Sequence, residues 1–569
     1  MHALCPKIIE PAMKRNPLVF RSKPVLAFGR ALGLAAFAAC MALPALAEVE
    51  LDGRNATPEA IVRIAHGEPV RIAPAARQRV REAHAVLLDA ARAGKQIYGL
   101  TVGVGLNKDR SMVDASGELT QEIVEASRRF NIALLRAHSG GAGPDAPVAD
   151  VRAAMAARLN ALLSGGGGVQ ESIVDAYVRF LNEGITPAIP SVGSIGEADI
   201  TILSHVGVAM LGEGDVYYQG RRQPASAAFA AAGVAPIQPF GKDGLSILSS
   251  NSYASGLASL ALVDLANLGR HSKLVYALSL QALNGNVSPF LEDSLALRPF
   301  PDTVKAGAEL RRLLSGSSLW NQDASRRLQD PLSFRTGVFL IGELDRTQSE
   351  LRALLNVQYN ASDDNPGVAI GVKPRSSRWQ EQQSYLARGG AVLPTANFVP
   401  LPWVLAFEQT AIALGHHSLA SAQRIGRLND PNFTSLSRSL GTEHTVHAFG
   451  AMEKPAIALA AENKSLAQPV SMDFSPSSGN IEDVATNAPA VVQRVRKQID
   501  NTYALLAIEL VHAVQAAELR RRKDPAFTLS PATQALADAL RKRVAFLEQD
   551  RPLTGDYRAA AEVLRAYRP

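Results

Sequence analysis

The stretch from Asn251 to Gln281 reads NSYASGLASLALVDLANLGRHSKLVYALSLQ. Its apolar residues recur at helical spacing and occupy more than one face, a pattern typical of a helix buried among other helices. Further stretches carry helical spacing, and no segment alternates as a β-sandwich would. The sequence therefore predicts an all-α fold with few or no strands, the most plausible strand lying near Asp215–Gln219. The other predicted helices are 75–93, 148–163, 172–182, 303–314, 338–355, 402–421, 454–466 and 491–519.

The composition agrees with this fold class. Of the 569 residues, 47% are apolar and only 6% are aromatic, and Ala and Leu dominate. These two residues are strong helix formers. A chain of this length is too long to fold around one small hydrophobic core, so we expect a large, multi-lobed protein.

The net charge of +6 comes mostly from the first 47 residues, which hold six cations and one acid. Removing that segment takes away 5 charges and leaves about +1, so nothing favours nucleic acid as a partner. The segment has a basic region up to Arg30, a short apolar run, and Ala45-Leu46-Ala47 as a small-x-small cleavage site. It predicts a signal peptide, export to the periplasm, and no stable membrane anchor after cleavage. Met13 is a candidate true start.

Both cysteines, Cys5 and Cys40, lie in this leader. The mature chain would therefore have no disulfide, no cysteine nucleophile and no thiolate metal site. A lipoprotein with Cys40 in a poor lipobox stays an alternative. We expect no metal, because His416, His417, His444 and His447 lack an accompanying carboxylate pattern.

Six stretches resemble, in order, the motifs of the histidine, phenylalanine and tyrosine ammonia-lyase family. The match runs from about Tyr98 to Asn487. The matching stretches are Tyr98–Gly105, Ala137–Gly140 with Arg152–Asn160, Gly193–Gly214, Gln329–Arg335, Ser362–Pro366, and Ala461–Ala467 with Ser478–Asp483.

The resemblance implies an elongated bundle of long, mostly parallel or antiparallel helices with a loop-rich N-terminal lobe. It also implies a homotetramer whose active sites are shared between subunits. We predict a signal peptide over 1–47, an N-terminal lobe over 48–240, a central bundle over 241–525, and a helical tail over 526–569.

One departure from the family pattern concerns its prosthetic group. Family members cyclise an Ala-Ser-Gly triad into an electrophilic methylidene-imidazolone. Here the segment reads Gly196-Glu197-Ala198-Asp199, one residue shorter and without serine or a following glycine. Ser194 is no substitute, because Ile195 follows it. We therefore expect no methylidene-imidazolone and no other cofactor.

Further departures fall on expected pocket positions. Leu332 replaces the family's second catalytic tyrosine, and Val338-Phe339 replaces Pro-Gln. Ser249-Ser250-Asn251 stands at the NGT segment, and Asn397-Phe398-Val399-Pro400 at NFHG. These changes indicate altered chemistry rather than general decay.

The retained residues suggest how an elimination would work. Tyr98 matches the family's catalytic-base tyrosine. A phenol acts as a base near pH 7 only if neighbouring donors or cations lower its pKa. Arg335 matches the arginine that clamps a substrate carboxylate. Glu462 matches a glutamate facing the substrate's amine or ring. Glu197 is new and would pair with a cationic leaving group or act as a base.

Other positions are expected to line the pocket. They are the ring-contacting His138 and the polar or apolar positions Asn251, Gln329, Leu332 and Asn397. Plainer roles stay open: a packed loop tyrosine for Tyr98, an ion pair with Asp330 for Arg335, helix bridging for Glu462, space filling for Glu197, and a satisfied loop histidine for His138.

Three functions follow as hypotheses. The first is a lyase without the electrophile, cleaving C–N from a small carboxylate with an already good leaving group, as the ergothioneine trimethylamine-lyases do. The second is a C–O or retro-Michael lyase on an aryl-propanoid-type acid. The third is a non-catalytic binding protein.

Overall fold

The computed structural model describes residues 48–97, 100 and 121–568, all of them in one compact unit, Leu46–Pro569. Short helices and strands alternate in its first half. The helices are α1 (Pro58–Ala65), α2 (Pro74–Arg92), α3 (Gln121–His138), α4 (Val148–Leu163), α5 (Glu171–Glu183), α6 (Ile200–Met210), α7 (Ala225–Ala232) and α8 (Asp243–Leu248). The strands are β1 (Val49–Leu51), β2 (Val70–Ile72), β3 (Ala142–Asp145), β4 (Thr186–Pro187), β5 (Pro190–Val192), β6 (Asp215–Tyr218) and β7 (Arg221–Pro224).

The second half contains the longest helices. Its helices are α9 (Ser252–Leu283), α10 (Glu292–Ala296), α11 (Pro301–Leu314), α12 (Leu332–Arg335), α13 (Gly337–Tyr359), α14 (Trp379–Gln382), α15 (Leu401–Asn429), α16 (Pro431–Thr434), α17 (Glu453–Leu466), α18 (Ala488–Lys523), α19 (Pro531–Arg541) and α20 (Thr554–Ala566). Short 3-10 helices cover Ser288–Phe290, Ser318–Trp320, Arg438–Leu440 and Ser478–Asn480, and strands β8 (Gly367–Ala369) and β9 (Ala391–Leu393) form a hairpin.

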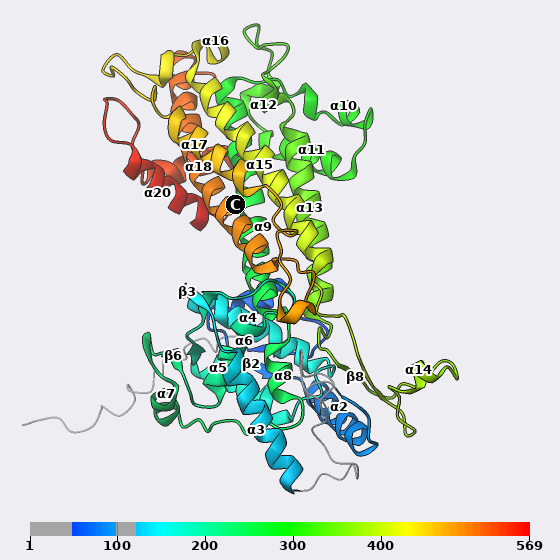
Figure 1. Cartoon of the computed structure of the whole chain (residues 1–569). Helices are drawn as coiled ribbons and strands as arrows, with labels where there is room; N and C mark the ends of the chain where they lie inside the picture. Colours follow the sequence, from blue (N-terminus) through cyan, green and yellow to red (C-terminus); the bar gives the residue numbers. More distant parts are fainter. Residues whose placement is uncertain (1–47, 98–99, 101–120, 569) are drawn as a thin grey trace, which may run out of the picture. The chain divides into compact units, whose positions relative to one another are not determined.

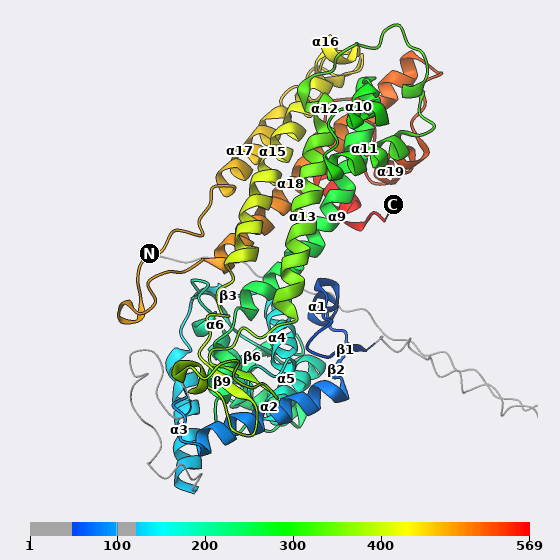
Figure 2. The same cartoon turned by 90° about the vertical axis from the view of Figure 1, so that its right-hand side faces the viewer.

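Four long helices, α9, α13, α15 and α18, run side by side (Figures 1 and 2). The predicted long helices overlap these elements along most of their length. The predicted all-α fold is confirmed. α9 is buried along almost its whole length, as its apolar residues on several faces indicate. Gly256 permits its close packing on α4, because a Cβ there would lie 2.5 Å from the backbone nitrogen of Ala154.

The strands are short and form small sheets. β1 pairs with β2 in parallel, β3 with β5 antiparallel, and β4, β6 and β7 form an antiparallel sheet that contains the predicted strand near Asp215. β8 and β9 pack against α2, so the chain returns to the first half of the fold after α13. The loop between β5 and α6 follows the pairing of β3 with β5, and the loop before α9 follows α8.

The bundle also encloses charge. Arg424 of α15 and Glu509 of α18 are fully buried and form a two-pronged ion pair, with Nε–Oε1 at 2.6 Å and Nη2–Oε2 at 2.9 Å. Removing one partner of such a pair destabilises the fold, because the other charge is left buried without compensation. Over residues 48–97, 100 and 121–568, no helix is both long and apolar enough to cross a bilayer.

Candidate active site

The loop between β5 and α6 carries Glu197. Two of its residues have left-handed backbone, Gly196 with φ 81° and Ala198 with φ 61°. For a residue with a Cβ this conformation is strained, and such strain persists only where surrounding structure holds it. Glu197 lies between these two residues and is half-buried.

The segment before α18 holds this loop from one side. The hydroxyl of Thr486 donates to the carbonyl of Gly196 at 2.9 Å, and the backbone NH of Asn487 donates to the carbonyl of Ile195 at 2.7 Å. A Cβ on Gly196 would lie 2.5 Å from the backbone nitrogen of Ala488. A glycine is therefore required at position 196 by both its φ and its surroundings.

Asp199 holds the loop from the other side. Its carboxylate accepts from the hydroxyl of Ser194 at 2.5 Å and from the backbone NH of Ala254, in the first turn of α9, at 2.9 Å. Its own backbone NH donates to the carbonyl of Ser250 at 2.7 Å. Burial raises the pKa of Asp199 to about 6, against the lowering effect of these hydrogen bonds.

Glu197 itself has a strongly perturbed carboxyl group. Burial, and secondly the negative charge of Glu482, raise its pKa to about 7. A carboxyl with such a pKa exchanges its proton near neutral pH, as general acid–base catalysis requires. Sequence reasoning selected Glu197 but did not select Glu482, which belongs to a matched motif and shows its effect only through space.

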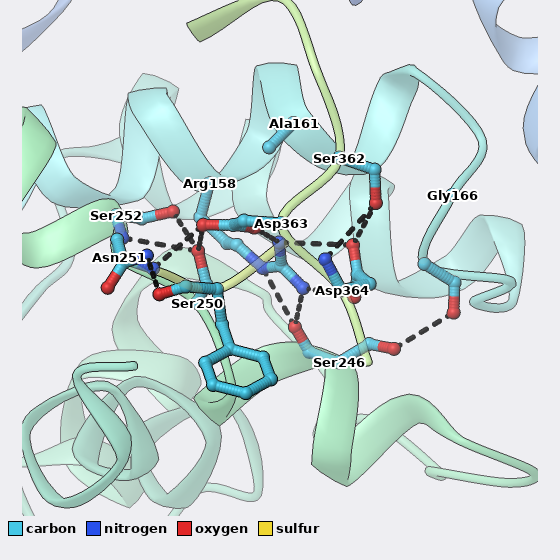
Figure 3. A network of polar contacts seen from close by, with 12 residues as sticks. Arg158, Ala161, Gly166, Ser246, Ser250, Asn251, Ser252, Ser362, Asp363 and Asp364 are labelled. Carbon is cyan, nitrogen blue, oxygen red and sulfur yellow. Dashed lines mark hydrogen bonds and ion pairs between the residues drawn. The ribbon is translucent and has the colours of Figure 1, made fainter. Parts of the chain in front are cut away.

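The loop before α9 carries Asn251 and is joined to the Glu197 loop by the hydrogen bond from Asp199 to the carbonyl of Ser250. Figure 3 shows Asn251 beside Asp363. The backbone NH of Asn251 donates to Asp363 at 2.7 Å, and its side-chain amide donates to the carbonyl of Phe398. Asn251 is fully buried, and its Oδ1 has no hydrogen-bond partner among the described residues. Asn397, next to Phe398, is exposed at this end of the fold.

A buried ion-pair network supports that loop. Arg158 of α4 contacts Asp363 at 3.0 Å and Asp364 at 2.7 Å, and all three side chains are almost completely buried (Figure 3). The hydroxyl of Ser250 donates to Asp363 at 2.8 Å. Lys242 Nζ lies 3.6 Å from Asp364, without a hydrogen-bond partner among the described residues, and burial lowers its pKa.

His138 is the last residue of α3. Its Nδ1 lies 2.8 Å from the carbonyl of Leu134, and the next residue, Ser139, contacts His205 Nδ1 at 3.0 Å. The following strand, β3, pairs with β5, which leads into the loop. The structure thus joins the loops of Glu197 and Asn251 at the start of α9, and the side-chain contact of Asn251 with Phe398 brings in the neighbouring Asn397. His138 is linked to the Glu197 loop only through the pairing of β3 with β5.

A second group of predicted residues lies elsewhere in the chain. Arg335 ends α12, and the carbonyl of the preceding Phe334 accepts from the hydroxyl of Tyr276 in α9. Tyr276 follows Ala254, the residue bound to Asp199, by 22 positions in α9. At 1.5 Å per residue this is about 33 Å. Arg335 and Glu197 of one chain therefore cannot act on the same small molecule.

Two predicted pocket residues near Arg335 are exposed to solvent, and Arg335 itself is partly buried. Leu332 is 60% exposed and Gln329 is exposed as well. The guanidinium of Arg335 forms no ion pair or hydrogen bond within the described part of the chain. Burial raises the pKa of Asp330, and the positive charge of Arg335 nevertheless acts to lower it, so a longer-range interaction between the two residues stays open.

Glu462 lies on α17 and is also apart from the Glu197 loop. Its carboxylate is about half exposed and lies 3.7 Å from the ammonium of Lys497 on α18. The next residue, Asn463, is buried and donates to Ser418 at 2.7 Å and Thr502 at 3.0 Å, which fixes this turn of the helix. Tyr98 lies outside the described residues.

Comparisons with known proteins bear on this geometry. The aromatic amino acid lyase family matches residues 56–542. A histidine ammonia-lyase of Chloroflexus aurantiacus is 31% identical over 517 residues, covering 88% of this chain and 93% of that protein. This chain belongs to the aromatic amino acid lyase family.

Two more relatives of this family member are informative. A tyrosine ammonia-lyase of Cupriavidus metallidurans is 28% identical over 548 residues, covering 92% of this chain and 97% of that protein. The solved structure of ergothionase, an ergothioneine-degrading enzyme of Treponema denticola, in complex with desmethyl-ergothioneine sulfonic acid, matches with a TM-score of 0.81 and 34% identity, covering 91% of this chain and 99% of that one. Family and relatives support a lyase of the ammonia-lyase type and confirm the predicted membership.

Proposed function

We propose that this family member is a lyase that works without a methylidene-imidazolone, cleaving a C–N bond by general-base β-elimination from a small carboxylate-bearing substrate in the periplasm. The observation that carries the proposal is Glu197, a half-buried carboxyl with a pKa near 7 in the segment where the family places its electrophile. The similarity to ergothionase supports a quaternary amine as the leaving group.

The residues present do not fit the family's prosthetic group. The segment Ile195–Asp199 contains no serine to dehydrate. The nearest serine in the sequence is Ser194, and its hydroxyl is already used, because it donates to Asp199 and accepts from the backbone NH of Gly196 at 3.1 Å. No step of the proposed reaction passes through that group, and no metal or other cofactor is invoked.

In the proposed reaction a base removes the β-proton, the C–H electron pair forms the C=C bond, and the amine leaves with the C–N electron pair. Tyr98 would take the proton and Arg335 would hold the carboxylate as a planar, two-pronged donor. Glu197 or Glu462 would face the cation. A trimethylammonium group leaves without prior activation, so general-base catalysis and charge stabilisation supply the rate enhancement.

We propose that each site is completed by another subunit of a homotetramer. The Glu197 loop and α12 contact α9 at points about 33 Å apart along the helix, which supports this proposal because one chain cannot bring them together. Exposed apolar side chains on α15 and α17 also support association between subunits. Ile412 is 45% exposed, and Leu419 and Ile457 are each 54% exposed. Monomers rarely leave such patches uncovered.

The test is to offer purified protein ergothioneine and related betaines, and to follow the conjugated product by ultraviolet absorbance. Glu197→Gln and Arg335→Lys should each abolish most turnover, whereas Asp483→Asn, at an exposed carboxyl near Glu482, should retain it. Absence of product with every betaine would remove the trimethylamine version. Appreciable ammonia release from histidine or phenylalanine would overturn the proposal that the electrophile is lost.

A second candidate is a C–O or retro-Michael lyase on an aryl-propanoid-type acid. It is favoured by the apolar side chains beside Arg335, with Leu332 60% and Phe339 37% exposed. A panel of aromatic β-substituted acids separates the two reactions, because only the second would consume them. Binding of such acids without turnover, unchanged by Tyr98→Phe, would instead indicate a non-catalytic binding protein.

A further inference from the structure

The connection between β8 and β9 is far longer than a hairpin turn needs. The two strands pair directly, Gly367 with Leu393 and Ala369 with Ala391, yet residues 370–390 separate them. Hairpin loops usually have roughly two to five residues, and much longer loops that are ordered usually carry a function. Residues 370–390 are called the arm below. Figure 1 shows its helix α14 on a segment that extends outward from β8.

The base of the arm is fixed to the fold. The backbone NH of Gly390 donates to the carbonyl of Val372 at 2.8 Å, and that of Leu386 donates to the carbonyl of Gly390 at 2.9 Å. Ile370 and Leu386 pack against a buried apolar cluster that includes residues of α2, β8 and β9. The arm is therefore a defined element of the structure that carries its middle part away from the core.

The middle of the arm presents an aromatic ring and several cations to solvent. Trp379, the first residue of α14, is 74% exposed. The exposed cations, none of which forms an ion pair in the part of the chain that the structure describes, are Lys373, Arg375, Arg378 and Arg388. Their charges are thus available to an external partner.

Glu381 is the one acidic residue of the arm. Its carboxylate accepts from the hydroxyl of Ser376 and from the backbone NH of Ser376, the latter at 3.1 Å. The hydrogen bond from the hydroxyl is the main cause that holds the pKa of Glu381 below its ordinary value, with the charge of Arg375 as a minor one. Glu381 therefore shapes the turn before α14 and stays ionised.

The arm concentrates positive charge on a chain that is otherwise close to neutral. Its four cations and one acid give a net charge of +3, whereas residues 48–569 together carry about +1. Attraction to an anionic surface therefore acts mainly on the arm. Tryptophan prefers the headgroup level of a bilayer, and lysine and arginine are attracted to anionic headgroups, so the arm combines both preferences.

We propose that the arm binds the surface of a bilayer with anionic headgroups, with Trp379 at headgroup level and Arg375 and Arg378 on lipid phosphates. The contact is reversible, because one ring and a few cations fall short of a stable anchor. It concerns where the protein works and not the reaction, so it does not depend on the proposed function.

The first experiment is co-sedimentation of the purified protein with two kinds of vesicle. One contains phosphatidylglycerol and phosphatidylcholine in equal amounts, and the other contains phosphatidylcholine alone. We expect binding to the mixed vesicles only. Salt at about 1 M should abolish this binding, because the screening length falls to about 3 Å.

Variants locate the contact on the arm. Arg375→Gln combined with Arg378→Gln should lower the partition constant about 25-fold, at about fivefold for each cation. The control is Lys454→Gln combined with Lys542→Gln, which removes the same charge from exposed positions on α17 and after α19. It should change the constant less than about twofold, because charges more than about 8 Å from the surface are screened.

A second measurement follows the ring itself. The chain has three tryptophans, and the other two are Trp320, 42% exposed, and Trp403, 2% exposed. The fluorescence emission of the wild-type protein should move to shorter wavelength when mixed vesicles are added. Trp379→Phe should remove this shift.

Four results would overturn the proposal. They are equal binding to both kinds of vesicle, equal partition constants for the arm variant and its control, an emission shift that survives Trp379→Phe, and an emission shift of Trp379 that appears with protein concentration alone. The last result would assign the arm to contact between copies of the chain. Turnover is measured in solution without vesicles, so none of these results decides the proposed function.

Discussion

The substitution Glu197→Gln should make the protein more stable above neutral pH while removing activity. The carboxyl has an ordinary pKa of 4.5 and a folded-state pKa of about 7. Between these values the folded state binds more protons than the unfolded state, so stability falls as pH rises through the window. Glutamine keeps the volume and stays neutral, so the variant lacks this loss.

The size of the effect follows from the shift. A difference of about 2.5 pKa units corresponds to about 3.4 kcal/mol at pH 8 at most. Glu197 is only half-buried, and solvent screening reduces the figure to about 1–2 kcal/mol. An unfolding entropy of about 2.1 cal/mol/K per residue, over roughly 520 residues, makes this about 1–2 °C in Tm.

The assay compares thermal unfolding of wild type and variant at pH 5 and pH 8, at one scan rate because large proteins often unfold irreversibly. The Tm of Glu197→Gln should exceed that of wild type at pH 8 and match it at pH 5. Asp483→Asn, an exposed carboxyl nearby, should show no such pH-dependent difference. If Glu197→Gln were less stable than wild type at pH 8, Glu197 would be a structural anchor, and its assignment to chemistry would be refuted.

Four further predictions follow from the contacts described. Asp364→Asn, which leaves the buried guanidinium of Arg158 partly unpaired, should lower the free energy of unfolding by about 3–5 kcal/mol, measured by denaturant titration; an unchanged midpoint contradicts this. Lys242→Met should change the free energy of unfolding by less than about 1 kcal/mol, since the buried ammonium has no hydrogen-bond partner among the described residues. A loss as large as that of Asp364→Asn would show that the ion pair of Lys242 with Asp364 stabilises the fold. Gly196→Ala should cost about 1–3 kcal/mol and reduce turnover, because the added Cβ meets backbone at 2.5 Å; full turnover would mean that the loop adjusts. Arg335→Lys should lower kcat/KM at least about tenfold without changing Tm, because lysine lacks the planar two-pronged donor but keeps the positive charge near Asp330; a drop in Tm would indicate a structural role.

The long helices were predictable because each is one continuous segment whose apolar residues recur at helical spacing. Ser252–Leu283 begins one residue after the predicted start, and Ala488–Lys523 extends a few residues beyond the prediction at both ends. The small sheets were mostly missed. Strands such as Val49–Leu51 and Ala142–Asp145 are three or four residues long, too short for alternation to register.

The candidate site was only partly predictable. Motif order selected Glu197 and Asn251, whose loops are joined at the start of α9 by the hydrogen bonds of Asp199. It also selected Arg335, but it carries no information on which copy of the chain supplies that side chain. Glu482 was missed because its influence on Glu197 is a charge acting through space, and no local pattern marks such a pair.

The length of α9 between Ala254 and Tyr276, about 33 Å, predicts how two inactive variants behave when one cell makes both. A cell that makes only Glu197→Gln chains, or only Arg335→Lys chains, has every site damaged. If each site is completed by another subunit, as proposed, the mixed assemblies in a cell that makes both contain some sites with an intact loop from one chain and an intact arginine from another. Activity should therefore reappear on co-expression, at a fraction set by random assortment of the chains. A protein with self-contained sites could never show this rescue.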